Sequence, residues 1–132
     1  MTSDVAQKTT VEWLSESVCE RWQVVGEEPS VVEWRRLRDE MGVDGCSETG
    51  IATAIFVLDL NTVECVVNQE TDWSQVHAGV VNLVSRGWQV NVLAHLSALG
   101  SAHTRLSGST ANLQGWWGTE GGGVHFANAE LA

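Results

Sequence analysis

The sequence has little positive charge: lysine and arginine together number 7 of 132 residues, against 17 aspartates and glutamates, for a net charge of -10. Proteins that track nucleic-acid phosphates need clustered basic side chains to displace counterions. The low count therefore argues against nucleic acid as a partner. The whole acidic excess lies in residues 1–72, and a field of one sign over part of a small protein attracts a basic partner.

The chain also has few cysteines and no long apolar run. Cys19, Cys46 and Cys65 are odd in number and far apart, with no Cys-x-x-Cys pair. This pattern excludes a disulfide framework and a zinc knuckle, so we predict small buried thiols. No window approaches the roughly 20 apolar residues of a membrane span, and residues 1–8 lack the features of a secretion signal. We therefore expect a cytoplasmic protein without membrane contact.

Hydrophobic periodicity predicts two helices at the start of the fold. A capping box of Thr9 with Glu12 opens an amphipathic helix that Gly26 ends. A second capping box, Ser30 with Glu33, opens another helix. The polar face of the first helix carries three glutamates: Glu12, Glu16 and Glu20.

Five strands are predicted after these helices, over residues 51–60, 63–69, 88–96, 111–117 and 124–126. An amphipathic helix over 72–86 and a shorter one over 97–107 separate the later strands. Residues 1–8 are expected to form a flexible arm and residues 9–132 a single domain. The order of elements predicts an α/β or α+β fold, in which helices pack on a mixed sheet of about five strands.

The histidines do not predict a metal site. The four lie on three or four different elements, and none has the His-x-x-x-His spacing that a metal selects. His95 and His103, however, flank the junction between a strand and a helix, and ligands of open α/β sheets bind at the carboxyl ends of strands. A small-ligand-binding domain with these two histidines at its site therefore stays open.

Aromatic composition is unusual, with seven tryptophans, two phenylalanines and no tyrosine. Trp13 falls off the apolar stripe of its helix, and Trp116 and Trp117 point to opposite faces of a strand. These three indoles either form part of a partner surface, where tryptophan is favoured, or belong to a tryptophan-rich core.

The stretch 51–126 resembles, in a degenerate form, the core of the restriction-endonuclease-like PD-(D/E)xK superfamily. The resemblance lies in the order of the elements: an acidic helix, a hairpin that spans residues 55–70, a crossover helix at 72–86, and a strand leading into a short helix. It implies a nuclease-like α/β fold. In that family an acid at the start of the hairpin and an acid-x-Lys pair on its second strand hold Mg²⁺ or Mn²⁺, which activates water.

The residues that would carry this chemistry are replaced here. The only lysine of the chain is Lys8, so none occupies the motif position. On the hairpin Glu64 and Glu70 remain, and Glu40 of the second predicted helix is the third acid available. If nuclease activity survived, the resemblance implies that these three glutamates would be the catalytic metal ligands.

We therefore expect a non-catalytic protein-binding or regulatory module on a degenerate nuclease-like fold, with no catalytic residue and no cofactor. Its expected partner is a protein of basic character or a second copy of the chain. The alternatives are a divalent-metal-dependent nuclease or phosphodiesterase and a small-ligand-binding domain.

Overall fold

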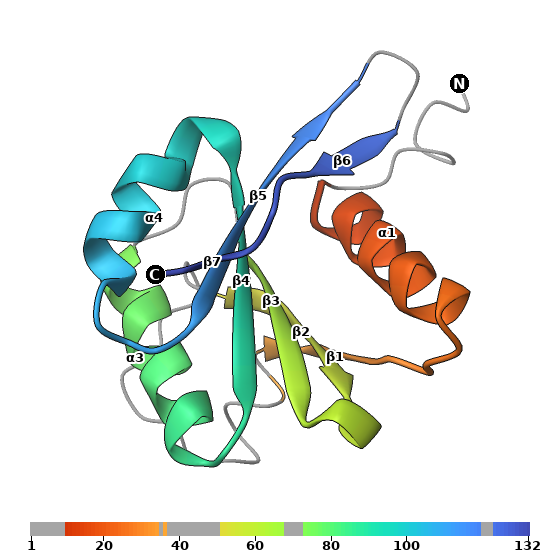
Figure 1. Ribbon diagram of the computed structural model, residues 1–132, viewed down its shortest axis with the longest axis horizontal. Coiled ribbons are helices and arrows are strands. Elements are labelled where there is room, and N and C mark those ends of the chain that lie inside the picture. Colours follow the sequence, from red (N-terminus) through yellow and green to blue (C-terminus); the bar gives the residue numbers. More distant parts are fainter. Residues whose placement is uncertain (1–9, 35, 37–50, 68–72, 120–122) are drawn as a thin grey trace.

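The protein is built on one mixed β-sheet with helices on both faces (Figure 1). The computed structural model describes residues 10–34, 36, 51–67, 73–119 and 123–132. The helices are α1 (Thr10–Val24), α3 (Trp73–Ser85) and α4 (Leu99–Leu106), with short 3-10 turns η2 (Leu58–Leu60) and η3 (Leu96–Ala98). The strands are β1 (Ser30–Glu33), β2 (Ile51–Val57), β3 (Thr62–Val67), β4 (Gln89–His95), β5 (Asn112–Gly118), β6 (Val124–Phe126) and β7 (Glu130–Leu131).

The strands lie in the order β1-β2-β3-β4-β5-β6, and β7 pairs with β5 beyond the end of β6. Strands β1, β2 and β3 are antiparallel neighbours, whereas β3, β4 and β5 are parallel. The two parallel connections pass through α3 and α4. Crossovers of this kind are right-handed, so two that advance in the same direction place both helices on the same face of the sheet. The opposite face is left for α1 (Figure 1).

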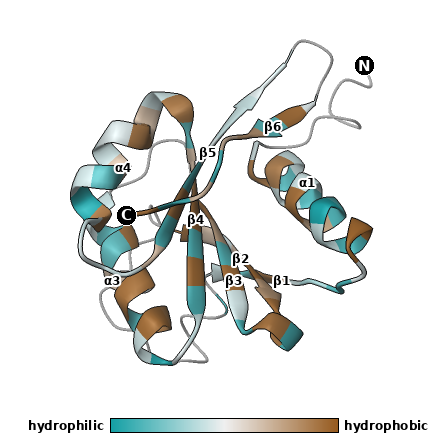
Figure 2. Cartoon of the chain, in the orientation of Figure 1, coloured by the Kyte–Doolittle hydropathy of each residue, from teal (hydrophilic) through white to brown (hydrophobic). Residues whose placement is uncertain are grey.

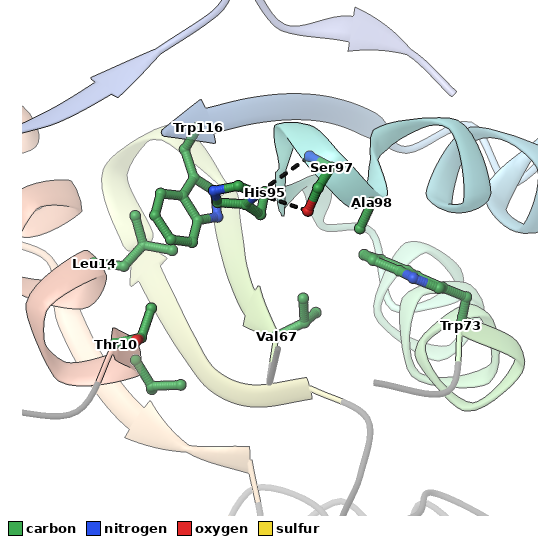
Figure 3. A pocket seen from close by; sticks show the side chains of 9 residues that line it. Thr10, Leu14, Val67, Trp73, His95, Ser97, Ala98 and Trp116 are labelled. Atoms are coloured by element: carbon green, nitrogen blue, oxygen red, sulfur yellow. Dashed lines mark hydrogen bonds between the residues drawn. The ribbon is translucent and has the colours of Figure 1, made fainter. Parts of the chain in front are cut away.

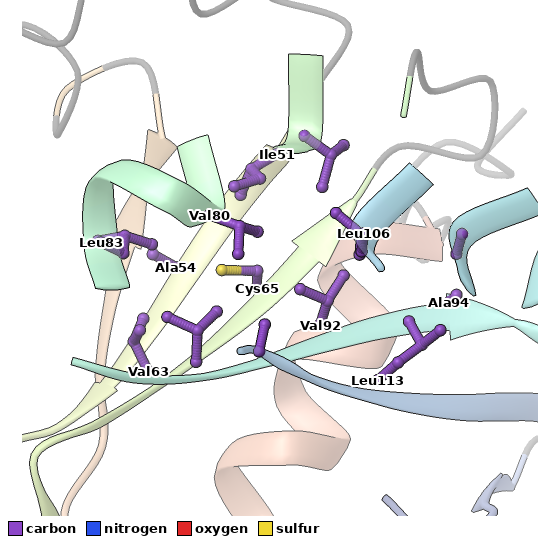
Figure 4. Close-up of a cluster of buried hydrophobic side chains, with 14 of the residues drawn as sticks. Ile51, Ala54, Val63, Cys65, Val80, Leu83, Val92, Ala94, Leu106 and Leu113 are labelled. Atoms are coloured by element: carbon purple, nitrogen blue, oxygen red, sulfur yellow. The ribbon is translucent and has the colours of Figure 1, made fainter. Parts of the chain in front are cut away.

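The larger core lies between the sheet and helices α3 and α4 (Figure 4). A glycine in α3 brings this helix close to its neighbours, because a Cβ at Gly79 would lie 2.9 Å from the Trp34 ring and 3.0 Å from Ile51. The buried side chains drawn in this layer include Ala54, Val63, Cys65, Val80, Leu83, Val92, Leu106 and Leu113.

The smaller core lies under α1, whose residues alternate between hydrophilic and hydrophobic along the helix (Figure 2). The buried side chains of this core are Leu14, Val18, Ile55, Val66, Leu93 and Trp116. Only one stripe of α1 contacts the sheet, so the rest of the helix stays at the surface. Within the described ranges, no helix has both the length and the apolar character needed to cross a lipid bilayer.

The structure confirms an α/β fold with a mixed sheet, and it changes two details. The five predicted strands correspond to β2 through β6, but the described residues form a sheet of seven strands. The second predicted helix is wrong at its start, because Ser30–Glu33 form β1. The β-branched Val31 and Val32 suit an extended chain, and pairing with β2 satisfies backbone groups that β2 would otherwise leave open. The rest of that predicted helix and the predicted arm over 1–8 lie outside the described residues, except for Trp34 and Arg36.

The chain after β5 turns back and pairs with it in two pieces. Phe126 lies opposite Trp116, and Glu130 lies opposite Leu113. The returning chain advances by four residues between these pairs (130 − 126), whereas β5 advances by three (116 − 113). The extra residue is a β-bulge, which separates β6 from β7.

Cys65 is fully buried in the core on the α3 side, as predicted for a small apolar thiol. Burial, and to a lesser degree the negative charge of Glu64, raises the pKa of the Cys65 thiol from 9.0 to about 12. The unfolded chain therefore loses this proton first, so stability is unaffected below about pH 9 and falls as the pH rises toward 12. Cys19 is half-buried, and Cys46 lies outside the described residues.

We expect this thiol to contribute a measurable alkaline loss of stability. By pH 10 the free energy of unfolding should fall by about 1 kcal/mol more in the wild type than in Cys65→Ala, because only the wild type carries the thiol whose pKa is raised. Urea unfolding at pH 7 and pH 10 measures the difference. Identical pH dependence in the two proteins would contradict the assignment.

Candidate functional site

A surface hollow lies between α1 and the edge of the described sheet, and we refer to it as the α1–β1 groove. Its volume is about 650 Å³. The groove is lined by Val11, Glu12, Ser15, Glu16, Cys19, Glu20 and Gln23 of α1, by Val31 and Glu33 of β1, and by Thr53 of β2. Because α1 covers the sheet only with its apolar stripe, one polar flank of the helix forms the wall of the groove.

Four carboxylates border this groove. Glu12, Glu16 and Glu20 follow one another at intervals of four residues on α1, and all three are exposed. Residues four apart are neighbours on a helix, so they form a continuous acidic ridge. Glu33 faces the ridge from β1 and is also exposed. The described residues that line the groove include no basic side chain.

The spacing of these charges predicts a stability effect. Like charges four residues apart destabilise a helix by about 0.2–0.5 kcal/mol, and a glutamate followed by a lysine stabilises it by a similar amount. Glu20→Lys therefore should raise the free energy of unfolding by about 0.5–1 kcal/mol, which urea denaturation can resolve. A less stable Glu20→Lys protein would show that Glu20 makes a stabilising contact that outweighs its repulsion with Glu16.

Ser15 provides an unpartnered polar group in the groove. Its side chain is only 7% exposed, and its Oγ has no hydrogen-bond partner among the residues that the structure describes. A helical serine commonly donates to the carbonyl four residues earlier, as Ser17 does to Trp13 at 3.1 Å. A buried hydroxyl without a partner costs free energy. Ser15 lines the groove, so its wall contains a buried hydroxyl whose bonding capacity the described residues leave unused.

A buried ion pair fixes α1 on the sheet. Glu64 of β3 is 1% exposed, and its two carboxylate oxygens accept bonds from Arg21 Nη2 at 2.7 and 3.0 Å. The Trp22 indole N–H donates to the same carboxylate. The Arg21 guanidinium also lies 4.2 Å from the centre of the Phe126 ring. Two successive residues of α1 thus bind one carboxylate, which sets the rotation of the helix about its axis.

Two amides from neighbouring strands complete this network. Asn91 of β4 lies directly opposite Glu64 in the parallel register and donates to its carboxylate at 2.6 Å. Gln114 of β5 accepts from Arg21 and from Asn91, both at 3.1 Å, and donates to the Ala127 carbonyl at 2.7 Å. A buried carboxylate with a cation and several donors is well compensated, whereas an unpaired one is costly. The network therefore holds α1 so that its glutamates face away from the sheet.

This environment does not favour the metal-binding alternative. Both oxygens of Glu64 already accept hydrogen bonds from a guanidinium, an indole and an amide. Glu40 and Glu70 lie outside the described residues. In the part of the chain that the structure describes, no three histidine, cysteine, aspartate or glutamate side chains come together as metal ligands do. We therefore derive no metal-dependent chemistry from Glu64.

The two histidines predicted to share a ligand site line different hollows. His95 lies at the carboxyl end of β4, in a small hollow of about 50 Å³ with Thr10, Val67, Trp73 and Trp116 (Figure 3). Its Nδ1 accepts from the Ser97 backbone N–H at 3.1 Å, so the neutral ring carries its proton on Nε2. His103 lines a separate hollow on α4, 3.9 Å from the Glu130 carboxylate. Each histidine is thus held by its own local partners.

The three tryptophans predicted for a partner surface differ in exposure. Trp116 is 6% exposed and packs edge-on against Trp13, with ring centres 6.3 Å apart. Trp13 also covers Gly118, where a Cβ would lie 2.8 Å from the indole. Trp117 is 36% exposed and stacks on His125. Of the three indoles, Trp116 belongs to the core and Trp117 lies at the surface.

One wall of the α1–β1 groove is predictable from the sequence. The spacing of Glu12, Glu16 and Glu20 already predicts an acidic face on the first helix. The sequence does not place Glu33 in this groove, because its spacing from Ser30 predicts a helix cap. The local signal for a strand at this position is the pair Val31–Val32.

No protein-family model, curated protein or solved structure matches the chain.

Proposed function

We propose that this protein is a non-catalytic binding module that holds a basic segment of a partner protein in the α1–β1 groove. The observation that carries this proposal is the placement of four glutamates around a groove in which the buried hydroxyl of Ser15 has no partner within the described ranges. Lysine and arginine side chains complement both features, since they supply positive charge and hydrogen-bond donors.

Physical considerations favour a protein segment over a small cation. The groove is open and about 650 Å³ in volume, and apolar Val31 shares it with the carboxylates. Long basic side chains bury apolar stems and keep their charged ends near carboxylates. A field of one sign also speeds the encounter with an oppositely charged partner, in a manner that weakens with salt.

The proposal predicts that neutralising the ridge weakens binding of a basic peptide. The probe is a short fluorescein-labelled peptide of alternating lysine and valine, and its affinity is measured by fluorescence anisotropy. Glu16→Gln combined with Glu20→Gln should weaken binding about tenfold, because each exposed ion pair contributes up to about 1 kcal/mol. Binding by the wild type should also fall as ionic strength rises.

A variant with the same change in net charge provides the control. Asp59→Asn combined with Glu130→Gln removes two exposed carboxylates that do not line the groove. This protein should bind the peptide as the wild type does. Equal weakening by the two double variants would show that net charge alone attracts the peptide. Absence of binding by the wild type at low salt would overturn the proposal.

The Glu20→Lys variant separates binding from folding. We expect it to be more stable than the wild type and to bind the basic peptide more weakly. Such a trade-off is typical of residues kept for function at a cost in stability. A variant that gained stability without losing affinity would remove Glu20 from the proposed site.

A further inference from the structure

We propose that the basic segment binds in an extended conformation, as an additional strand paired with the outer edge of β1. This inference rests on the function proposed above, and it specifies the conformation and the residue pattern of the partner. The partner is a segment in which basic residues alternate with apolar ones.

The first observation is the position of β1. It pairs with β2 on one side and is the last strand in the order of the described sheet. An edge strand presents backbone N–H and C=O groups that a further strand can pair with. The four residues Ser30–Glu33 contain neither proline nor lysine, which commonly block such pairing.

The second observation is the direction of the side chains on β1. Val31 lies opposite Ile55, which belongs to the core under α1, and Glu33 lies opposite Thr53, which lines the groove. Directly opposed residues point to the same face of a sheet, so Val31 and Glu33 face the groove while Val32 faces the other layer. A strand added beside β1 therefore would place every second side chain in the groove.

The third observation is a match between two repeats. Glutamates four residues apart on α1 are separated by about 6 Å along the helix axis. Side chains on one face of a strand recur every two residues, which is about 6.7 Å. Lysines or arginines at alternate positions of the added strand therefore recur at about the interval of the ridge carboxylates. The intervening residues lie beside Val32, which predicts that they are apolar.

Backbone N-methylation tests strand pairing without changing the charge of the peptide. In a paired strand only alternate residues direct their N–H and C=O groups toward the neighbouring strand. Two versions of the lysine–valine peptide are made, one methylated on the lysines and the other on the valines. We expect one version to bind at least tenfold more weakly than the unmodified peptide and the other to bind within about threefold of it.

Amide hydrogen exchange supplies an independent readout. The unmodified peptide should slow exchange of backbone amides within Ser30–Glu33. A peptide of the same composition in shuffled order should bind more weakly and protect these amides less, because its lysines no longer alternate.

The outcomes separate this inference from the function on which it rests. All peptides could bind the wild type equally well and bind Glu16→Gln/Glu20→Gln more weakly. That result would overturn strand pairing but support the groove as a site for a basic segment. Weakened binding of both methylated peptides without protection of β1 would also overturn strand pairing. Failure of every peptide to bind would overturn the proposed function itself. The chain could also self-associate in the absence of peptide. If Glu16→Gln/Glu20→Gln abolished that self-association, the edge of β1 would be assigned to a second copy of the chain instead.

Discussion

Replacing Arg21 by methionine should destabilise the protein by about 3 kcal/mol. The change removes the cation that contacts Glu64 at 2.7 Å and leaves a carboxylate of 1% exposure without its charge partner. Breaking a buried pair from one side costs about 3–5 kcal/mol, and we expect the lower end because Arg21 is one-third exposed. Urea denaturation at neutral pH measures this loss.

A second substitution shows whether the cost comes from the uncompensated charge. Glu64→Gln in the Arg21→Met background removes the buried charge and keeps an oxygen that accepts hydrogen bonds. The double variant should therefore regain about 1–2 kcal/mol relative to Arg21→Met alone. Arg86→Met, at an exposed arginine bonded to Asn82, should change stability by less than about 0.5 kcal/mol. A double variant that is less stable than Arg21→Met would contradict the assignment.

Two adjacent tryptophans should respond very differently to truncation. Trp116→Ala should lower the free energy of unfolding by about 3–5 kcal/mol, because it leaves a cavity between α1 and the sheet. The buried indole makes T-shaped contacts with the rings of Trp13 and His95, at centre distances of 6.3 and 4.8 Å. Trp117→Ala should cost about 1 kcal/mol or less, since that side chain is at the surface.

Thermal and urea unfolding of the two variants provide the comparison, and each serves as the control for the other. The loss of Trp117 removes its stack on His125, with ring centres 5.4 Å apart. Similar losses at the two positions would show that the hairpin of β5 and β6 is packed as tightly on its outer face as on the face that contacts α1.

The strands and crossover helices were predictable because their signals are local. Ile51–Val57 is apolar on both alternating faces, as a strand covered on both sides requires, and it is buried along almost its whole length. Strand β1 was not predictable in this way. Ser30 and Glu33 have the spacing of a helix cap, which competes with the strand preference of Val31 and Val32, and pairing with Phe56 and Thr53 decides in favour of the strand.

The candidate site could be predicted only in part for the same reason. The ridge of glutamates follows from spacing within one helix, whereas the role of Glu64 depends on Arg21, which is distant in sequence. From the sequence, Glu64 lies on a half-polar strand face and suits a metal ligand. Its burial under α1 is a tertiary effect, and the amides of Asn91 and Gln114 that support it come from two further strands.

The bulge between β6 and β7 interrupts one edge of the described sheet. Where both edges of a sheet can pair, each bound molecule offers a fresh edge to the next, and growth continues into a fibre. Here the chain beside β5 departs from regular pairing near Ala127, whose carbonyl accepts from the Gln114 side chain. Of the two edges in the described sheet, only that of β1 is free of such a break. If a partner strand adds at β1 as we propose, this break at the opposite edge predicts a complex of fixed size that does not polymerise.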